Sequence, residues 1–154
     1  MIRRLTPQEE TTPGSGRGLR MPPFGHILAV GVGGALGAVM RHAFILAFPD
    51  QAGGFPFVTF AENVVGSFLL GVVLISLLRA PALGERWRPF LATGVLGSFT
   101  TFSNVSVQFV ELALDGATPT AILYLTLSMA TGLLAAAAGI ALGVRLMTRF
   151  RPAR

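Results

Sequence analysis

The sequence contains no cysteine and no lysine, and it carries little charge of either sign. The absence of cysteine excludes disulfides, thiolate metal sites and cysteine nucleophiles. The absence of lysine excludes the phosphate-binding loop of P-loop nucleotide hydrolases. Only 12% of the 154 residues are charged, whereas 52% are hydrophobic. Because soluble domains are about one-quarter charged, this composition indicates an integral membrane protein.

The net charge of +5 does not indicate a nucleic-acid partner. A nucleic-acid binder presents its basic residues as a stripe on a soluble fold, whereas the twelve arginines here sit mainly in tails and loops. The sequence also has no glycine-rich phosphate loop, no catalytic triad and no paired carboxylates. We therefore expect neither nucleic-acid binding nor enzymatic activity.

Four hydrophobic stretches follow one another along the chain, each near the ~20 residues that a helix needs to cross a bilayer. They run from about Gly25 to Phe48, Phe57 to Leu78, Phe90 to Leu114 and Pro119 to Leu146, with short turn-rich connections between them. Helices of a soluble bundle need a polar face, but residues 116–144 contain no charged side chain. The sequence thus predicts an all-α membrane protein with four transmembrane helices.

Polar tails flank this predicted transmembrane domain, which covers residues 25–148. Residues 1–24 are rich in Pro, Gly, Thr and charge, which predicts a flexible tail. This tail lacks the apolar region of a signal peptide, because apolar character begins only at Phe24. Residues 149–154 form a second, basic tail.

Glycine is frequent on the first, second and fourth predicted spans. Small residues let helix backbones approach closely in lipid, where packing drives association. This pattern predicts a tight bundle or oligomer, although it does not indicate transport by itself.

The distribution of arginine predicts the orientation of the chain in the membrane, because short cytoplasmic loops and flanks carry an excess of basic residues. Eleven arginines fall on one predicted side: Arg3, Arg4, Arg17, Arg20, Arg79, Arg86, Arg88, Arg145, Arg149, Arg151 and Arg154. The first and third connections contain none. We therefore expect both termini in the cytoplasm and one fixed topology in the plasma membrane.

The third span contains a polar stretch, Gly94 to Ser106, at the expected depth of the bilayer midplane. Irregular polar backbone survives there only where it lines a cavity or is wrapped in protein. One interpretation is a discontinuous helix whose released backbone groups bind an ion. The alternative is a Ser/Thr-rich packing face whose hydroxyls bond to the preceding turn. We favour the broken helix.

Two other polar groups lie within the spans. Asn63 and Ser67 are four residues apart and share a helix face, so both can point into one groove. Alternatively, Asn63 makes an interhelical hydrogen bond that fixes packing. Arg41, near the end of the first span, either attracts anions in a watery vestibule or anchors the helix at the interface.

Three motifs in order resemble those of the Fluc (CrcB) fluoride channels. They are residues 33–42 (GGALGAVMRH), residues 63–71 (NVVGSFLLG) and residues 94–103 (GVLGSFTTFS). The resemblance covers about residues 27–145. It implies passive export of fluoride, which prevents its toxic accumulation, by a dimer of two oppositely oriented four-helix subunits with two pores along the interface.

The resemblance also implies roles for individual residues. Asn63 and the aromatic ring edges of Phe99 and Phe102 are expected to contribute to the anion pathway. The backbone carbonyls of Gly97 and Thr100 are expected to hold a structural sodium ion between subunits. The expected polar track consists of Thr101, Ser103, Ser106 and Ser128.

Two residues depart from the family pattern. Val105 stands where the family has its second pore phenylalanine, and an aliphatic side chain has no positive ring edge to offer. Glu62 replaces an apolar residue, and a carboxylate near an anion path would repel fluoride unless it is neutral, paired or turned away. These departures predict that at least one pore contribution is lost.

The strong arginine bias argues against a homodimer, because a subunit fixed in one orientation cannot form an antiparallel pair with itself. We therefore favour a heterodimer with a related subunit of reversed bias over a homodimer. One alternative function is a small multidrug-type, proton-coupled cation exporter that uses Glu62. Another is an assembly subunit that does not transport.

Overall fold

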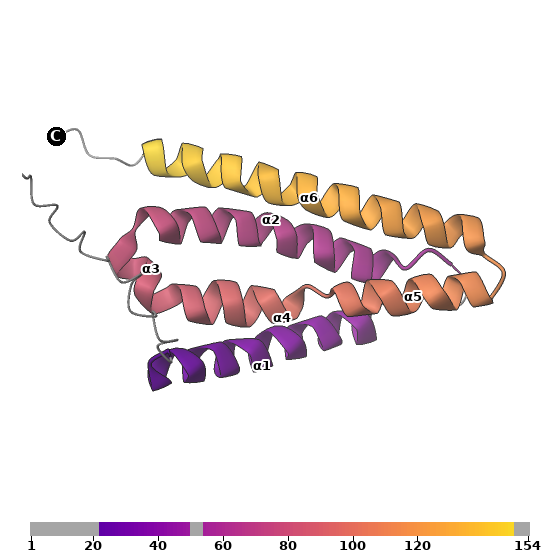
Figure 1. Cartoon of the computed structure of the whole chain (residues 1–154), viewed down its shortest axis with the longest axis horizontal. Helices are drawn as coiled ribbons and strands as arrows, with labels where there is room; N and C mark the ends of the chain where they lie inside the picture. Colours follow the sequence, from indigo (N-terminus) through magenta and orange to yellow (C-terminus); the bar gives the residue numbers. More distant parts are fainter. Residues whose placement is uncertain (1–21, 50–53, 150–154) are drawn as a thin grey trace, which may run out of the picture.

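The computed structural model describes residues 22–49 and 54–149, which form a bundle of helices running along one axis (Figure 1). Most of the predicted tails, residues 1–24 and 149–154, lies outside these described residues. The elements in chain order are α1 (Phe24–Ala47), α2 (Phe57–Arg79), α3 (Pro81–Arg88), the π-helix η1 (Pro89–Leu96), α4 (Gly97–Phe99), α5 (Phe102–Leu114) and α6 (Thr118–Arg149). The described part of the chain contains no strand.

Four helical segments are long and apolar enough to cross a membrane, as the sequence predicts. They are Phe24–Ala47, Phe57–Arg79, Pro81–Leu114 and Thr118–Thr148. Large hydrophobic side chains such as Leu133 and Val39 stay exposed along them, 74% and 66% respectively. In a membrane, lipid or a partner chain covers such surfaces.

The second connection is helical, although the sequence predicted a turn-rich loop there. Residues 81–88 form α3, which begins at Pro81. Proline is favoured at the first position of a helix, because its fixed φ suits the helix and its missing N–H would have no partner there. α3 leads directly into η1, so the third apolar segment begins at Pro81 and includes most of the predicted second connection.

The third span is broken, which confirms the interruption predicted from Gly94 to Ser106. Thr100 and Thr101 adopt extended backbone conformations, with φ/ψ of −78°/148° and −147°/117°. Just before them, the Gly97 N–H donates to the carbonyl of Ala92, the i→i−5 spacing of a π-helix. Figure 1 shows a short non-helical loop between α4 and α5.

Two pairs of helices pack closely where glycine residues meet the backbone of the neighbouring helix. α1 packs mainly against η1, and α2 packs mainly against α6. A Cβ at Gly37 would collide with the carbonyl oxygen of Val95, and a Cβ at Gly139 would collide with that of Phe68. Glycine therefore permits both backbone contacts, as the small-residue pattern predicts.

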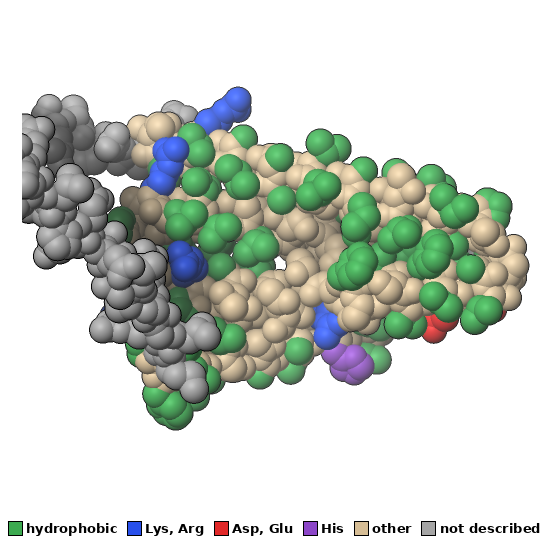
Figure 2. Space-filling view, in the orientation of Figure 1, with side chains coloured by type: hydrophobic (Ala, Val, Ile, Leu, Met, Phe, Trp, Pro, Cys, Tyr) green, Lys and Arg blue, Asp and Glu red, His purple; other side chains and the backbone are tan. Residues whose placement is uncertain are grey.

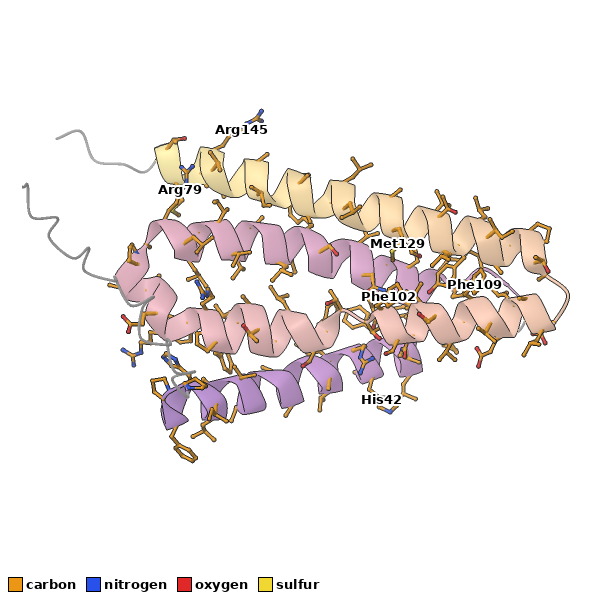
Figure 3. The ribbon with its side chains drawn as sticks, in the orientation of Figure 1. His42, Arg79, Phe102, Phe109, Met129 and Arg145 are labelled. Atoms are coloured by element: carbon orange, nitrogen blue, oxygen red, sulfur yellow. The ribbon has the colours of Figure 1, made fainter. Side chains whose placement is uncertain are left out.

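One end of the bundle is basic and holds both ends of the described chain. α1 begins, α2 ends and α6 ends on the same side, so both ends of the described chain lie together (Figure 1). Basic side chains gather at this end of the bundle (Figure 2), where Figure 3 labels Arg79 and Arg145. A buried cluster of Val105, Leu112, Ala121 and Tyr124 lies between α5 and α6. The helix break lies between the charged end and this cluster.

Candidate functional site at the helix break

Asn63 of α2 holds the break by hydrogen bonding to the backbone of Thr101. Its Nδ2 donates to the Thr101 carbonyl at 3.0 Å, and its Oδ1 accepts from the Thr101 N–H at 2.8 Å. Extended backbone within a span has lost its helical partners, and unpaired backbone groups are costly in hydrocarbon. The Asn63 Oδ1 replaces the helical partner of the Thr101 N–H, and the Asn63 Nδ2 adds a donor to the Thr101 carbonyl, which as the N-cap residue of α5 also accepts the first bond of that helix. Asn63 therefore makes the interhelical bond of its second predicted interpretation.

Hydroxyl groups stabilise the two helix ends that meet at the break. The Thr100 Oγ1 donates to the Leu96 carbonyl at 3.0 Å, at the end of η1. The Thr101 Oγ1 accepts from the Asn104 N–H at 3.2 Å and caps α5, and it lies 3.0 Å from the Ser103 Oγ. Threonine at these positions thus ends one helix and starts the next.

The break also releases the two carbonyls that the family resemblance assigns to sodium. In an unbroken helix, the Gly97 carbonyl would accept from the Thr101 N–H, which instead bonds to Asn63. The Thr100 carbonyl would accept from the Asn104 N–H, which instead bonds to the Thr101 Oγ1. Both oxygens are left without their helical donors, so they fit a hard cation such as sodium.

A groove of about 290 Å³ opens beside the break. Residues of α2, the broken segment and α6 line it: Asn63, Ser67, Thr100, Thr101, Phe102, Val105, Ser128, Met129, Gly132, Leu133 and Ala136. Figure 3 labels Phe102 on α5 and Met129 on α6. No charged residue is among the described residues that line this groove.

Two polar groups on opposite walls of the groove can donate to a bound anion. Ser128 is 4% exposed, and within the described part of the chain its Oγ has no hydrogen-bond partner. A carboxamide has two N–H donors, and the bond from Asn63 to the Thr101 carbonyl uses only one of them. The groove therefore offers neutral donors of the kind that coordinate a small anion.

Not every predicted pathway residue lines the groove. It brings together four of them, namely Asn63, Thr101, Phe102 and Ser128. Ser106 donates to the Phe102 carbonyl at 3.0 Å, which is the back-bonding of the packing interpretation. Ser103 is engaged with Thr101. Phe102 is 64% exposed, so most of its ring faces outward from the subunit.

Phe99 and Glu62 lie together at a different place. Both line a second pocket of about 350 Å³ between α1 and α2, together with Phe44, Phe48 and Phe57. Glu62 is 3% exposed, and the Phe99 ring contacts the Phe44 ring edge-on with centroids 6.1 Å apart. The Glu62 carboxylate is thus turned away from the groove that Asn63 lines.

Val105 and Arg41 have distinct environments. Val105 is 1% exposed and packs with Ala121 and Tyr124, so position 105 points into the bundle. Arg41 is half-buried near the end of α1, and its neighbour His42 projects away from the other helices (Figure 3). The role of Arg41 in attracting anions stays a prediction.

Sequence reasoning missed most of the wall that α6 contributes. Gly132 and Ala136 follow Ser128 at intervals of four residues, and all three line the groove. Residues at that spacing share a helix face. Extending the face from Ser128 along the fourth span would have found them.

Four membrane-spanning helices, one of them broken beside a polar groove, define a multi-pass membrane protein with the broken-helix architecture of ion-handling proteins. Residues 28–140 match the family described as CrcB-like protein, Camphor Resistance (CrcB), and the chain belongs to this family.

Curated relatives carry consistent names. The fluoride-specific ion channel FluC of Rhizobium meliloti is 42% identical over 118 residues, which cover 76% of this chain and 94% of that one. FluC 2 of Nocardia farcinica is 38% identical over 126 residues, 80% of this chain and 87% of that one. FluC 1 of Streptomyces coelicolor is 42% identical over 99 residues, and the match spans just under two thirds of each chain, 64%. These relatives are named as ion channels and not as enzymes.

Proposed function

We propose that this chain is a subunit of a fluoride-selective channel that lets fluoride leave the cytoplasm passively and so prevents its toxic accumulation. The observation that supports the proposal most directly is the pair of hydrogen bonds between Asn63 and Thr101. These bonds keep the third helix broken beside a groove that has neutral donors on two walls. The named activity of the relatives supports fluoride as the ion.

The chemistry of the groove suits rapid passage of an anion. The Asn63 N–H and the hydroxyls of Ser67 and Ser128 can replace part of the hydration shell of fluoride. The ring edge of Phe102 adds a positive rim. Among the described residues no arginine lines the groove, so its walls offer dipoles to fluoride, and conduction requires binding that is weak enough to release the ion.

A structural sodium ion is part of the proposal. The Gly97 and Thr100 carbonyls, whose helical donors are diverted, would hold it. Bound there, the ion would supply positive charge that compensates the exposed oxygens at the break. The residues of this chain fix the position of both carbonyls through Asn63 and Thr101.

The proposed channel is an antiparallel dimer in the plasma membrane, in which this subunit has both termini in the cytoplasm. The basic end of the bundle supports this orientation, because arginine is retained on the cytoplasmic side. The outward-facing ring of Phe102 supports completion of the pathway by a second subunit. A related chain with reversed arginine bias is the favoured partner.

Fluoride efflux from proteoliposomes, followed with a fluoride electrode, tests the proposal. We expect efflux from vesicles that contain this chain together with a candidate paralogue, and no efflux from vesicles that contain either chain alone. Efflux by this chain alone, with a normal dimer on a sizing column, would overturn the heterodimer. Absence of efflux with every partner, combined with proton-driven uptake of cations, would instead support the multidrug-type exporter, which the family assignment disfavours.

A further inference from the structure

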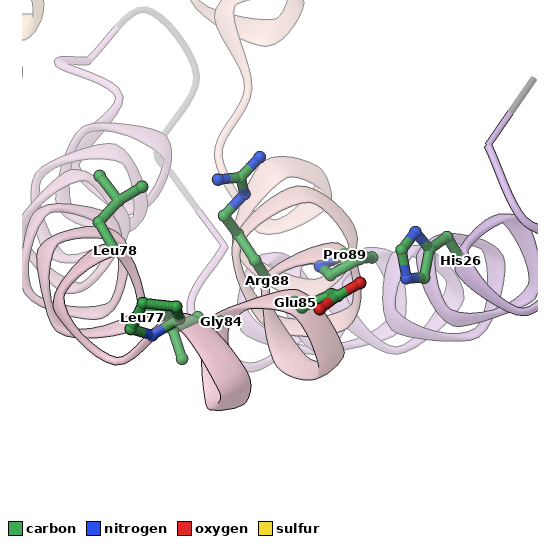
Figure 4. A pocket seen from close by; sticks show the side chains of 8 residues that line it. His26, Leu77, Leu78, Gly84, Glu85, Arg88 and Pro89 are labelled. Atoms are coloured by element: carbon green, nitrogen blue, oxygen red, sulfur yellow. The ribbon is translucent and has the colours of Figure 1, made fainter. Parts of the chain in front are cut away.

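A separate pocket of about 400 Å³ lies at the basic end of the bundle, where α1, α2, α3 and the start of η1 meet. Its lining residues are His26, Leu77, Leu78, Pro81, Gly84, Glu85, Arg88 and Pro89 (Figure 4). None of these residues takes part in the groove at the helix break. We name this cavity the headgroup pocket, and it is a separate candidate binding site.

The short helix α3 has the features of a segment that lies in the membrane interface. Leu83 and Trp87 are four residues apart and are 55% and 41% exposed, so an apolar face of α3 points outward. The Trp87 ring contacts the Phe90 ring with centroids 6.2 Å apart. Exposed tryptophan concentrates where acyl chains give way to headgroups. α3 accordingly brings the headgroup pocket to the depth of lipid headgroups.

The headgroup pocket contains charges of both signs. Arg88 and Glu85 project from the same helix, and within the described part of the chain neither side chain forms an ion pair or hydrogen bond. Figure 4 shows the Glu85 carboxylate facing the His26 imidazole, while the Arg88 guanidinium extends in a different direction. The pocket thus offers a cationic donor and an anionic acceptor at separate positions.

We propose that this pocket binds the headgroup of phosphatidylethanolamine. The Arg88 guanidinium would donate to the lipid phosphate, and the Glu85 carboxylate would accept from the primary ammonium. The exposed side chain of Leu78 provides an apolar surface for the start of an acyl chain. A purely anionic headgroup leaves Glu85 opposed to negative charge, and phosphatidylcholine has no N–H for a carboxylate. Complementary charge therefore favours the ethanolamine lipid over both.

Lipid retention by the purified full chain tests this proposal without measuring transport. The chain in detergent is mixed with phosphatidylethanolamine, phosphatidylglycerol or phosphatidylcholine and examined by native mass spectrometry. We expect preferential retention of phosphatidylethanolamine. Arg88→Gln and Glu85→Gln should each reduce that retention about tenfold, the loss expected when one charge-assisted hydrogen bond is removed. Arg86→Gln on the same helix, outside the pocket lining, is the matched control and should retain the lipid.

Several results would overturn the proposal. Equal retention of the three lipids would show an unselective lipid layer. Preference for phosphatidylglycerol, strengthened by Glu85→Gln, would show recognition of negative charge alone. If Arg88→Gln unfolds, Arg88→Lys preserves the positive charge and must keep the lipid preference. Preferential retention by a chain that conducts no fluoride with any partner would refute the proposed function but not this binding site.

Discussion

The carboxamide of Asn63 and the backbone of Thr101 exchange two hydrogen bonds, of 3.0 and 2.8 Å, across 38 positions of the sequence. Together they join α2 to the point where the third span is interrupted. The same bond pair frees the Gly97 carbonyl by taking the N–H that it would otherwise accept. One side chain thus keeps the helix broken and shapes the groove beside it.

Replacing Asn63 should destabilise the fold. Asn63→Ala leaves the Thr101 N–H without a partner and removes one donor from its carbonyl, and a buried unsatisfied group costs about 1–3 kcal/mol. Thermal unfolding in detergent should show a clearly lower midpoint. The control is Ser67→Ala, one turn along the same face, because the Ser67 hydroxyl forms no hydrogen bond in the described part of the chain. An unchanged midpoint for Asn63→Ala would contradict the proposed structural role of the pair.

Replacing Ser128 should slow transport without lowering stability. Its buried hydroxyl has no partner within the described residues, so Ser128→Ala removes a desolvated polar group and should not lower stability. Loss of a donor to fluoride should slow efflux about fivefold to tenfold, corresponding to roughly 1 kcal/mol.

The efflux assay for Ser128→Ala is run on the assembled channel, with Thr131→Ala as the matched control. The Thr131 hydroxyl is exposed and bonds to the Leu127 carbonyl of its own helix. Its removal should leave efflux and stability unchanged. Normal efflux by Ser128→Ala would remove this hydroxyl from the pathway.

The sequence predicts the fold more completely than it predicts the site. Span length and hydropathy fix the four crossings, because a helix must satisfy its backbone within hydrocarbon. The break is indicated by the polar stretch that contains Gly97, Thr100 and Thr101, because irregular polar backbone at this depth must line a cavity or be wrapped in protein. The helical form of residues 81–88 was missed because Pro81 and Gly84 indicate a turn, although Ala82, Leu83, Glu85, Arg86 and Arg88 are good helix formers and the segment packs against α2 and η1.

The limits of prediction at the site arise from choices among hydrogen-bond partners. Asn63 and Ser128 both line the groove. The four-residue spacing of Asn63 and Ser67 indicated the first, and the family resemblance indicated the second. Ser106 carries the same hydroxyl but bonds to the turn before it. Which outcome a serine adopts depends on its helix face and on its neighbours across the bundle, and neither is encoded in local sequence.

Close backbone contact between α2 and α6 should not tolerate a methyl group. Gly139→Ala places a Cβ against the Phe68 carbonyl oxygen, and backbone cannot move as a flexible side chain does. Forced separation of the helices should cost about 1–3 kcal/mol, measured by thermal unfolding. The control, Gly132→Ala on the same helix, meets the Ser67 Oγ at 3.7 Å, an ordinary contact. Because alanine is the better helix former, this control should be neutral or slightly stabilising. Equal midpoints for the two variants would argue against the close packing.

Glu62 offers the sharpest distinction between the two transport functions. Its carboxylate lines the aromatic pocket between α1 and α2, on a different side of α2 from the groove. Glu62→Gln keeps the shape of the side chain and removes its charge. Passive fluoride efflux by the assembled channel should therefore change by no more than about twofold, well under 1 kcal/mol.

The same variant carries the opposite expectation for a proton-coupled cation exporter. Such a protein needs a carboxylate that alternates between a proton and its substrate, so Glu62→Gln would abolish pH-driven uptake. Glu62→Ala separates charge from packing, because it also empties part of the pocket beside Phe99 and should lower stability by about 1–3 kcal/mol. Loss of fluoride efflux in Glu62→Gln, with normal folding, would place the carboxylate in the anion pathway. Unchanged efflux in Glu62→Gln and lower stability in Glu62→Ala would assign it a structural position outside that pathway.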